Sequence, residues 1–223
     1  MIDLHSHILH QLDDGPESID ESRECLRILA EFGFEELIPT PHRFHMLYDP
    51  QPEDVADRVA EIGSLLIRRF SFEYMYAHDL VERQFDAFEL STTASGWKVL
   101  LVEFLPFMSR KNDIEQAVFS LNMKGIAPLI AHIERYSMPD EFWAELKRKY
   151  AVYYQISLKT LSNRFFDNKR NQIIRLLDAG LIDNAATDLH RLAKIQQIEQ
   201  GLNYLHKKYS KQIARLFSLS FEG

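Results

Sequence analysis

Short apolar runs alternate with amphipathic helical segments along most of this chain. Seven runs have the length and the β-branched or aromatic content of buried strands. In the segments between them, apolar residues recur at helical spacing, as at Val55, Val59, Ile62 and Leu66. Alternating strands and helices favour parallel strands with right-handed crossovers, in an open sheet or a closed barrel. The predicted strands are residues 2–7, 37–40, 72–77, 97–104, 126–131, 152–157 and 182–187.

Local signals place several helix ends. Ser18 followed by Glu21 is a capping box, and Gly33 is expected to end that helix. A helix beginning at Asp113 ends at Gly125 by the same reasoning. Residues 80–96 have no clear pattern, and we expect a helical excursion with a Ser-Thr-rich loop there.

Composition narrows the class of protein. A chain of 223 residues with 46% hydrophobic content can bury one large core, so we expect residues 1–223 to form a single domain. The net charge of −7 argues against binding to a nucleic-acid backbone. No long apolar segment or secretory signal is evident, so we expect no membrane insertion and no export. The single cysteine, Cys25, allows no internal disulfide and suits a cytoplasmic location.

The first strand carries the strongest chemical signal. His5 and His7 are separated by one residue, so both imidazoles leave the same face of a strand and can reach one metal ion. The alternative is a pair of solvated or core-bonded histidines. In the acidic turn that follows, Asp14 is the preferred ligand and Glu17 a weaker one, although such turns are often plain surface.

Similar residues follow most of the other predicted strands. In α/β barrels the working residues lie at the carboxyl ends of the strands. Five of the nine histidines fall at these ends, whereas the sixth strand presents no obvious ligand. His45 lies close to the expected mouth. We therefore predict one metal centre, with these candidate ligands: His5, His7, Asp14, His42, Asp79, Glu103, His132, Asp188 and His190.

This donor set predicts phosphate chemistry. Imidazoles and carboxylates without a thiolate suit manganese, iron, zinc or magnesium. Adjacent divalent ions can activate a water and hold the oxygens of a phosphate, while Arg135 and Arg43 could clamp the remaining phosphate oxygens. A structural salt bridge is the alternative for Arg135. A Cys-x₅-Arg thiolate loop is excluded, because the position six residues after Cys25 is Glu31.

Six short stretches of the sequence, named at the end of this paragraph, resemble the polymerase-and-histidinol-phosphatase (PHP) superfamily and occur in the order found in that family. The resemblance covers essentially the whole chain and is closest to the bacterial manganese-dependent tyrosine phosphatases of capsule and exopolysaccharide regulation. Two departures are Asp79, where the family usually has glutamate, and His10-Gln11 before the acidic turn. The stretches are Ile2 to Leu9, Asp13 to Pro16, Thr40 to His42, Val102 to Phe104, Ala131 to Tyr136 and Thr187 to His190.

The resemblance implies a distorted (β/α)₇ barrel with two to three divalent ions, manganese first among them. It implies metal-ligand roles for the candidates above other than Asp79, and a phosphate-binding role for Arg135. The shorter Asp79 is expected to bind through a water or weakly. The implied substrate is a phosphotyrosine protein, such as the tail of an autophosphorylating kinase of polysaccharide synthesis. Alternatives are a PHP phosphoesterase acting on histidinol phosphate or another small monoester, and a metal-binding relative with weak catalysis.

Overall fold

The computed structural model describes residues 1–77, 80, 88–105, 110–162 and 168–221. Its strands are β1 (Ile2–Ser6), β2 (Glu36–Pro39), β3 (His42–Arg43), β4 (Glu73–Met75), β5 (Ser91–Thr92), β6 (Lys98–Glu103), β7 (Ile126–Ile130), β8 (Tyr153–Ser157) and β9 (Asn184–Ala186). Its helices are α1 (Ile19–Glu31), α2 (Pro52–Ile62), α3 (Lys111–Asn122), α4 (Asp140–Lys149), α5 (Leu158–Leu161), α6 (Asn168–Asp178), α7 (Ile195–Tyr209) and α8 (Ile213–Leu216). Each of the seven predicted strands is present, and β3 and β5 were not predicted.

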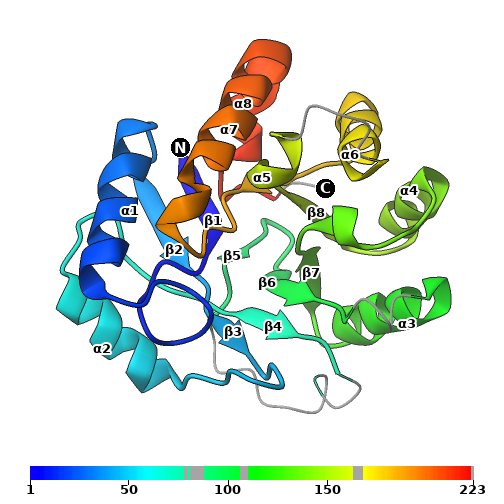
Figure 1. Cartoon of the computed structure of the whole chain (residues 1–223). Coiled ribbons are helices and arrows are strands. Elements are labelled where there is room, and N and C mark those ends of the chain that lie inside the picture. The colour runs from blue at the N-terminus through cyan, green and yellow to red at the C-terminus, as the bar shows by residue number, and fades with distance from the viewer. Residues whose placement is uncertain (78–79, 81–87, 106–109, 163–167, 222–223) are drawn as a thin grey trace.

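The parallel strands follow one another in chain order around a ring (Figure 1). β1 pairs with β2, and a second sheet runs from β3 through β4, β6, β7 and β8 to β9. Backbone bonds from Asp188 N to His5 O (2.9 Å) and from His7 N to Leu189 O (3.0 Å) join the segment after β9 to β1. The ring is distorted, since the β1–β2 register shifts between Asp3 and Ser6. The fold is the distorted (β/α)₇ barrel predicted from the sequence.

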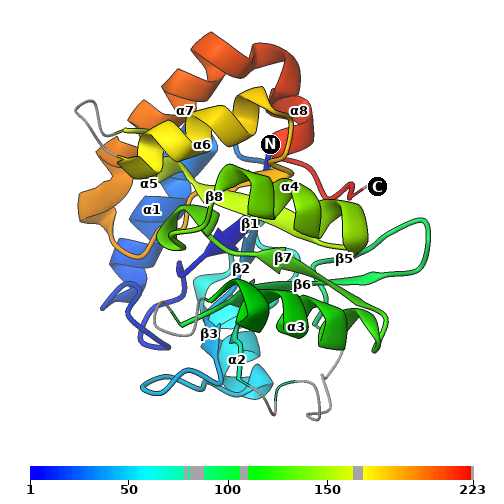
Figure 2. The same ribbon diagram turned by 90° about the vertical axis from the view of Figure 1, so that its right-hand side faces the viewer.

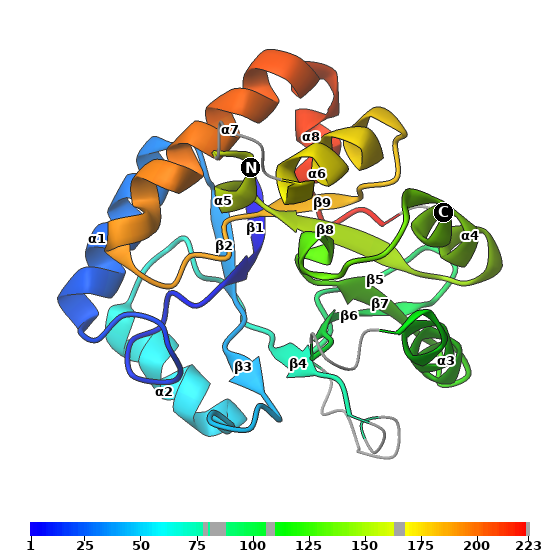
Figure 3. The same cartoon turned by 45° about the vertical axis from the view of Figure 1, so that its right-hand side comes forward.

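Helices surround the strands, as Figures 1 and 3 show. Figure 2 places α3 beside β6 and β7, with α4 and α6 on the other side of β7. α7 packs closely on α5 because Gly201 lacks a side chain: a Cβ there would lie 2.1 Å from the carbonyl oxygen of Leu158. None of the helices in the described residues combines the length and hydrophobicity that crossing a membrane requires.

Two hydrophobic clusters lie on opposite faces of the strands. The larger contains helix residues such as Leu29, Leu121 and Trp143, so it fills the space between strands and helices. The smaller takes alternate strand residues, including Val99 and Leu101 of β6, and contains no residue of a described helix. Because side chains alternate along a strand, Glu103 shares the face of Val99 and Leu101. The apolar interior thus ends in a carboxylate at the carboxyl end of β6.

Most helix ends follow the local signals. The backbone N–H of Glu21 donates to Ser18 Oγ (3.2 Å) at the start of α1. The helix predicted as far as Leu66 ends earlier, at Ile62, because Gly63 adopts a left-handed conformation with φ of 64°. In the segment 80–96, the described part includes β5, which pairs antiparallel with β6, in place of the loop expected there.

Candidate metal centre

The end of β1 is held against an acidic turn. His7 Nδ1 lies 2.6 Å from Asp13 Oδ2, and the same oxygen accepts the backbone N–H of His42 at 3.1 Å. The turn can approach β1 this closely because Gly15 has no Cβ, which would lie 2.2 Å from the His7 carbonyl oxygen. Asp13 therefore fixes the direction of one imidazole and joins the end of β1 to the start of β3.

An inner cluster is formed by His5, His7 and Glu73. The two histidine Nε2 atoms are 3.1 Å apart, and Glu73 Oε2 lies 3.4 Å from His5 Nε2 and 3.3 Å from His7 Nε2. The side chain of Glu73 is 1% exposed. Opposite the cluster, His5 Nδ1 is 2.6 Å from Gln155 Oε1 on β8. Three ligand-type atoms thus converge in the interior of the barrel, and both rings are oriented by second partners.

An outer cluster lies nearer to solvent and shares His7 with the inner one. Its four members are His7, Asp14, His42 and His190. Asp14 Oδ1 is 3.5 Å from His42 Nε2 and 3.3 Å from His190 Nε2, and the His7 and His190 rings stack at 3.9 Å. The Asp14 side chain is 48% exposed. Loops supply Asp14 and His190, whereas His5 and Glu73 of the inner cluster lie on β1 and β4, and His7 follows β1 directly.

A lateral cluster of His42, Glu73 and Glu103 extends the same group toward β6. His42 Nδ1 is 3.0 Å from Glu73 Oε2. His132 Nε2 is 3.0 Å from Glu73 Oε1 and 3.4 Å from Glu103 Oε1. Glu73 is therefore shared by the inner and lateral clusters and also contacts His132.

Two cations meet Asp188 at the edge of these clusters. Lys159 Nζ, from α5, lies 2.5 Å from Asp188 Oδ2, and Arg135 Nη2 lies 3.6 Å from the same oxygen. Arg135 Nη1 also donates to Glu103 Oε1 at 2.7 Å. The Arg135 side chain is 36% exposed, so its guanidinium faces both the carboxylates and solvent.

The carboxylates and imidazoles of the centre shift one another's pKa values through their charges and hydrogen bonds. Burial raises the pKa of Glu73, but the charge of His5 and hydrogen bonds with histidines including His132 hold that pKa well below its ordinary range. Burial and the charge of Glu73 raise the pKa of Glu103 to about 7. Burial lowers the pKa of His42, yet hydrogen bonds with Asp14 and Glu73 raise it overall to about 9. The pKa of each group is therefore set by its burial together with the other members of the centre.

The residues fit a site for divalent cations. The ligand atoms of each cluster lie within 4.8 Å of one another, and all are imidazole nitrogens or carboxylate oxygens. This donor set suits manganese, iron or zinc. Asp188 Oδ1 is buried and accepts no hydrogen bond, whereas Oδ2 faces Lys159, so Oδ1 keeps lone pairs for another positive partner. The three clusters could therefore hold neighbouring ions.

The structure brings together eight of the nine predicted ligands. Asp79 lies outside the described residues, so its role stays a prediction, and Glu73 on β4 joins the group as a residue that was not predicted. Of the weaker candidates, Glu17 pairs with Arg191 at 2.5 Å, and the His45 ring stacks on His42 at 4.8 Å. The eight that meet are His5, His7, Asp14, His42, Glu103, His132, Asp188 and His190.

The predicted phosphate-binding arginines are placed differently. Arg135 reaches the centre, whereas the contacts of Arg43 run to the following loop. Arg43 Nη1 donates to the carbonyl oxygen of Pro50 at 2.8 Å and lies 3.1 Å from Asp49 Oδ1. Cys25 is buried in α1, and burial raises the pKa of its thiol to about 12. A reactive thiolate is therefore disfavoured at that position.

Sequence reasoning missed Glu73, Gln155, Asp13 and Lys159. Glu73 stands inside a predicted strand, between Phe72 and Tyr74, where the search for ligands at strand ends did not look. A signal existed, because a carboxylate in an otherwise aromatic strand needs a buried partner. The partner interactions of Gln155 and Lys159 depend on side-chain directions that spacing alone does not give.

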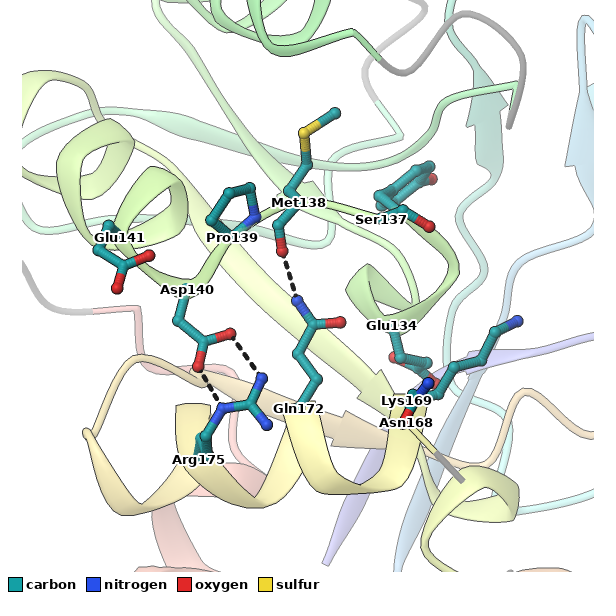
Figure 4. Close-up of a pocket in the computed structure, with 11 residues that line it drawn as sticks. Glu134, Ser137, Met138, Pro139, Asp140, Glu141, Asn168, Lys169, Gln172 and Arg175 are labelled. Carbon is teal, nitrogen blue, oxygen red and sulfur yellow. Dashed lines mark hydrogen bonds and ion pairs between the residues drawn. The ribbon is translucent and has the colours of Figure 1, made fainter. Parts of the chain in front are cut away.

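A hollow of about 520 Å³ lies beside the Arg135 turn, between α4 and α6 (Figure 4). Arg175 there makes two hydrogen bonds to Asp140, and Gln172 donates to the carbonyl oxygen of Met138 at 2.7 Å. Glu134 lines the hollow, and its Oε1 accepts the backbone N–H of Ser157 at 3.0 Å. These contacts tie the hollow's walls together and hold the turn that carries Arg135.

Comparison with protein families gives one match over nearly the whole chain. The family model described as capsular polysaccharide synthesis, CpsB/CapC, matches residues 1–220. The tyrosine-protein phosphatase CpsB of Streptococcus pneumoniae is 27% identical over 230 positions, covering 96% of this chain and 93% of that protein. The tyrosine-protein phosphatase YwqE of Bacillus subtilis is 26% identical and covers 100% of this chain and 90% of that protein.

Solved structures agree with the sequence matches. A crystal structure from work on YwqE and CpsB, described as unique metal-dependent tyrosine phosphatases, superposes with a TM-score of 0.77 at 26% identity. The match covers 100% of this chain and 96% of that chain. The L-hydantoinase of Arthrobacter aurescens gives a TM-score of 0.54 at 14% identity, over 91% of this chain and 60% of that one, which is a likeness of fold alone.

Proposed function

The chain belongs to the CpsB/CapC family of capsular polysaccharide synthesis, and from this membership we propose that it is a metal-dependent tyrosine-protein phosphatase. The observation that carries the proposal is the convergence of the inner, outer and lateral clusters around Glu73. A histidine–carboxylate centre at the carboxyl ends of barrel strands suits hydrolysis of phosphate monoesters.

The ligand roles belong to the proposal. Bound divalent ions, with manganese as the first candidate, would supply an activated water and hold phosphate oxygens. Gln155 and Asp13 orient two imidazoles, and Glu73 on β4 is proposed as a further ligand. The proposed ligands are His5, His7, Asp14, His42, Glu73, Glu103, His132, Asp188 and His190.

Arg135 and Lys159 supply positive charge beside the proposed metal ligands. Both approach Asp188, and Arg135 is partly open to solvent. A guanidinium can bind two phosphate oxygens at once, so Arg135 is proposed to hold the phosphate of the substrate. A tyrosine phenol has a pKa near 10, which makes it a tolerable leaving group without a strong general acid.

The biological setting is also a proposal. The family description and the relatives' names support a phosphotyrosine protein of capsule synthesis as substrate. Within that class we propose the tyrosine-bearing tail of an autophosphorylating kinase. We further propose that residues 1–223 act as one domain in the cytoplasm, where such a tail would be met.

Metal removal tests the activity. After chelation, hydrolysis of p-nitrophenyl phosphate and a phosphotyrosine peptide should fall to background, and manganese should restore it. Cys25→Ser is the control and should stay within a few fold of the unaltered protein, because the buried thiol lies in α1. Chelator-resistant hydrolysis that depends on Cys25 would contradict the proposal. Preference for histidinol phosphate in the same assay would favour the small-monoester alternative.

A further inference from the structure

The loop after β3 stacks two rings beside the outer cluster. The His45 ring centroid lies 4.8 Å from that of His42, with 24° between the planes. The Tyr48 ring lies 6.0 Å from His42 at 12° and 5.4 Å from His45 at 16°. His42, His45 and Tyr48 therefore form an aromatic wall, whose first member belongs to the proposed metal centre.

The wall leads from the metal centre toward solvent. Met46 and Leu47, between its two loop rings, are 82% and 78% exposed. His45 and Tyr48 themselves are only partly buried. A group bound at the outer cluster could therefore extend along the wall without entering the hydrophobic core.

Contacts within the loop hold this arrangement in place. The backbone N–H groups of Phe44 and Leu47 donate to Asp49 Oδ1 (2.9 Å) and His45 Nδ1 (3.2 Å). Arg43 joins the loop's two ends through the Pro50 carbonyl, and its guanidinium lies 4.9 Å from the centroid of the Phe44 ring. The direction of the wall is thus fixed by the loop's own hydrogen bonds. Arg43 is a positioning residue in this arrangement.

We propose that the aromatic wall is the aryl-binding face of the active site, against which the ring of a substrate phosphotyrosine lies. This inference rests on the proposed function and deepens it. In phosphotyrosine the ring is separated from phosphorus by a single ester oxygen, so a surface that recognises it must begin next to the phosphate-binding groups. Aromatic pairs are favourable at centroid separations of about 4.5–7 Å. An alkyl phosphate such as phosphoserine has no ring to place there, so the wall favours aryl esters.

Tyr48→Ala removes the outer ring of the wall, and Tyr48→Phe is the matched control that keeps it. The test uses the manganese-loaded protein and two peptides of one sequence, carrying either phosphotyrosine or phosphoserine. For Tyr48→Ala, KM for the phosphotyrosine peptide should rise about three- to tenfold, as expected for one lost aromatic contact. Its kcat, its metal content and kcat/KM for the phosphoserine peptide should stay within about twofold. Tyr48→Phe should behave as the unaltered protein does.

Two outcomes would overturn the inference. One is an equal loss with both peptides, which would make Tyr48 a general support of the metal centre. The other is no loss with the phosphotyrosine peptide.

Binding of non-hydrolysable phosphonate analogues of the two peptides, measured by calorimetry, separates this inference from the proposed function. If the unaltered protein hydrolyses neither peptide, the proposed function fails. The inference about the wall is then supported if Tyr48→Ala reduces the preference for binding the phosphotyrosine analogue. It is contradicted if that preference is unchanged.

Discussion

The inner and outer clusters use the same residue types on different supports. His5, His7 and Glu73 of the inner cluster are almost fully buried. In the outer cluster, by contrast, the Asp14 and His190 side chains are 48% and 19% exposed. His5 and Glu73 lie on strands β1 and β4 and His7 follows β1 directly, whereas loops bring Asp14 and His190 to the outer cluster.

This difference predicts different metal affinities. Donors held by packed strands lose little freedom when an ion binds, while exposed loop donors must first be ordered and stripped of water. We therefore expect the inner cluster to bind its ion more tightly than the outer cluster. His7 belongs to both clusters, whereas Asp14 and His190 belong to the outer cluster and not to the inner one.

Loss of the Glu73 carboxylate should have the largest effect. Glu73→Gln keeps the size of the side chain but removes the charge shared by the inner and lateral clusters. Turnover of p-nitrophenyl phosphate should fall roughly 1000-fold or more, as expected when a metal's stabilisation of transition-state charge is lost. Elemental analysis should show at least one ion fewer. Full metal content with normal turnover would remove Glu73 from the centre.

Arg135 should separate substrate binding from metal binding. A guanidinium carries no lone pair for a metal, so Arg135→Ala should leave the metal content of the three clusters unchanged. Loss of a charged phosphate contact of about 2–4 kcal/mol predicts a fall in kcat/KM of about 30- to 1000-fold. Arg135→Lys is the matched control and should recover part of the loss. An unchanged kcat/KM would assign Arg135 to a structural salt bridge with Glu103.

Substitution of Asp14 tests metal binding at the outer cluster separately from the inner cluster. Asp14→Asn should weaken metal binding there roughly 10- to 100-fold, because a neutral amide is a poorer ligand than a carboxylate. Activity lost at limiting manganese should return at high manganese, and the inner occupancy should not change. A manganese titration of activity makes the measurement. Equal loss of both ions would show that the clusters do not bind independently.

A rise in pH should lower the stability of the metal-free protein and increase the stabilisation that metal binding provides. His42 has a pKa of about 9 without metal, since hydrogen bonds to Asp14 and Glu73 outweigh burial. Its raised pKa stabilises the metal-free fold below about pH 6.5, and this contribution is lost as pH rises toward 9. Metal binding instead releases the proton, so affinity rises with pH. From pH 6.5 to 8.5, Tm in chelator should fall while the gain in Tm from manganese grows. A pH-independent gain would contradict the placement of His42.

The strands and most of the ligands at their ends could be predicted from the sequence. Strand periodicity located the seven strands, and the strand ends located His42, Glu103, His132 and Asp188. Glu73 was missed because ligands were sought at the ends of the predicted strands and Glu73 stands inside one, between Phe72 and Tyr74. Asp79 was chosen because it follows that strand.

Long side chains were harder to place than histidines. Arg43 was predicted to bind phosphate as an arginine able to clamp two oxygens, and the sequence did not indicate that its guanidinium contacts the Pro50 carbonyl and Asp49. Lys159 was missed because the sixth predicted strand seemed to lack a functional residue. The flexible stems of arginine and lysine allow several directions from one backbone position, and tertiary contacts choose among them.

Crystals of the protein prepared with a single equivalent of manganese would test the central claim most directly. Anomalous scattering would locate the ion and give its occupancy in each cluster. The account predicts that this first ion binds between His5, His7 and Glu73, with the outer cluster filling only when more manganese is added. A first ion at Asp14 and His190, or no anomalous peak among these residues, would contradict it.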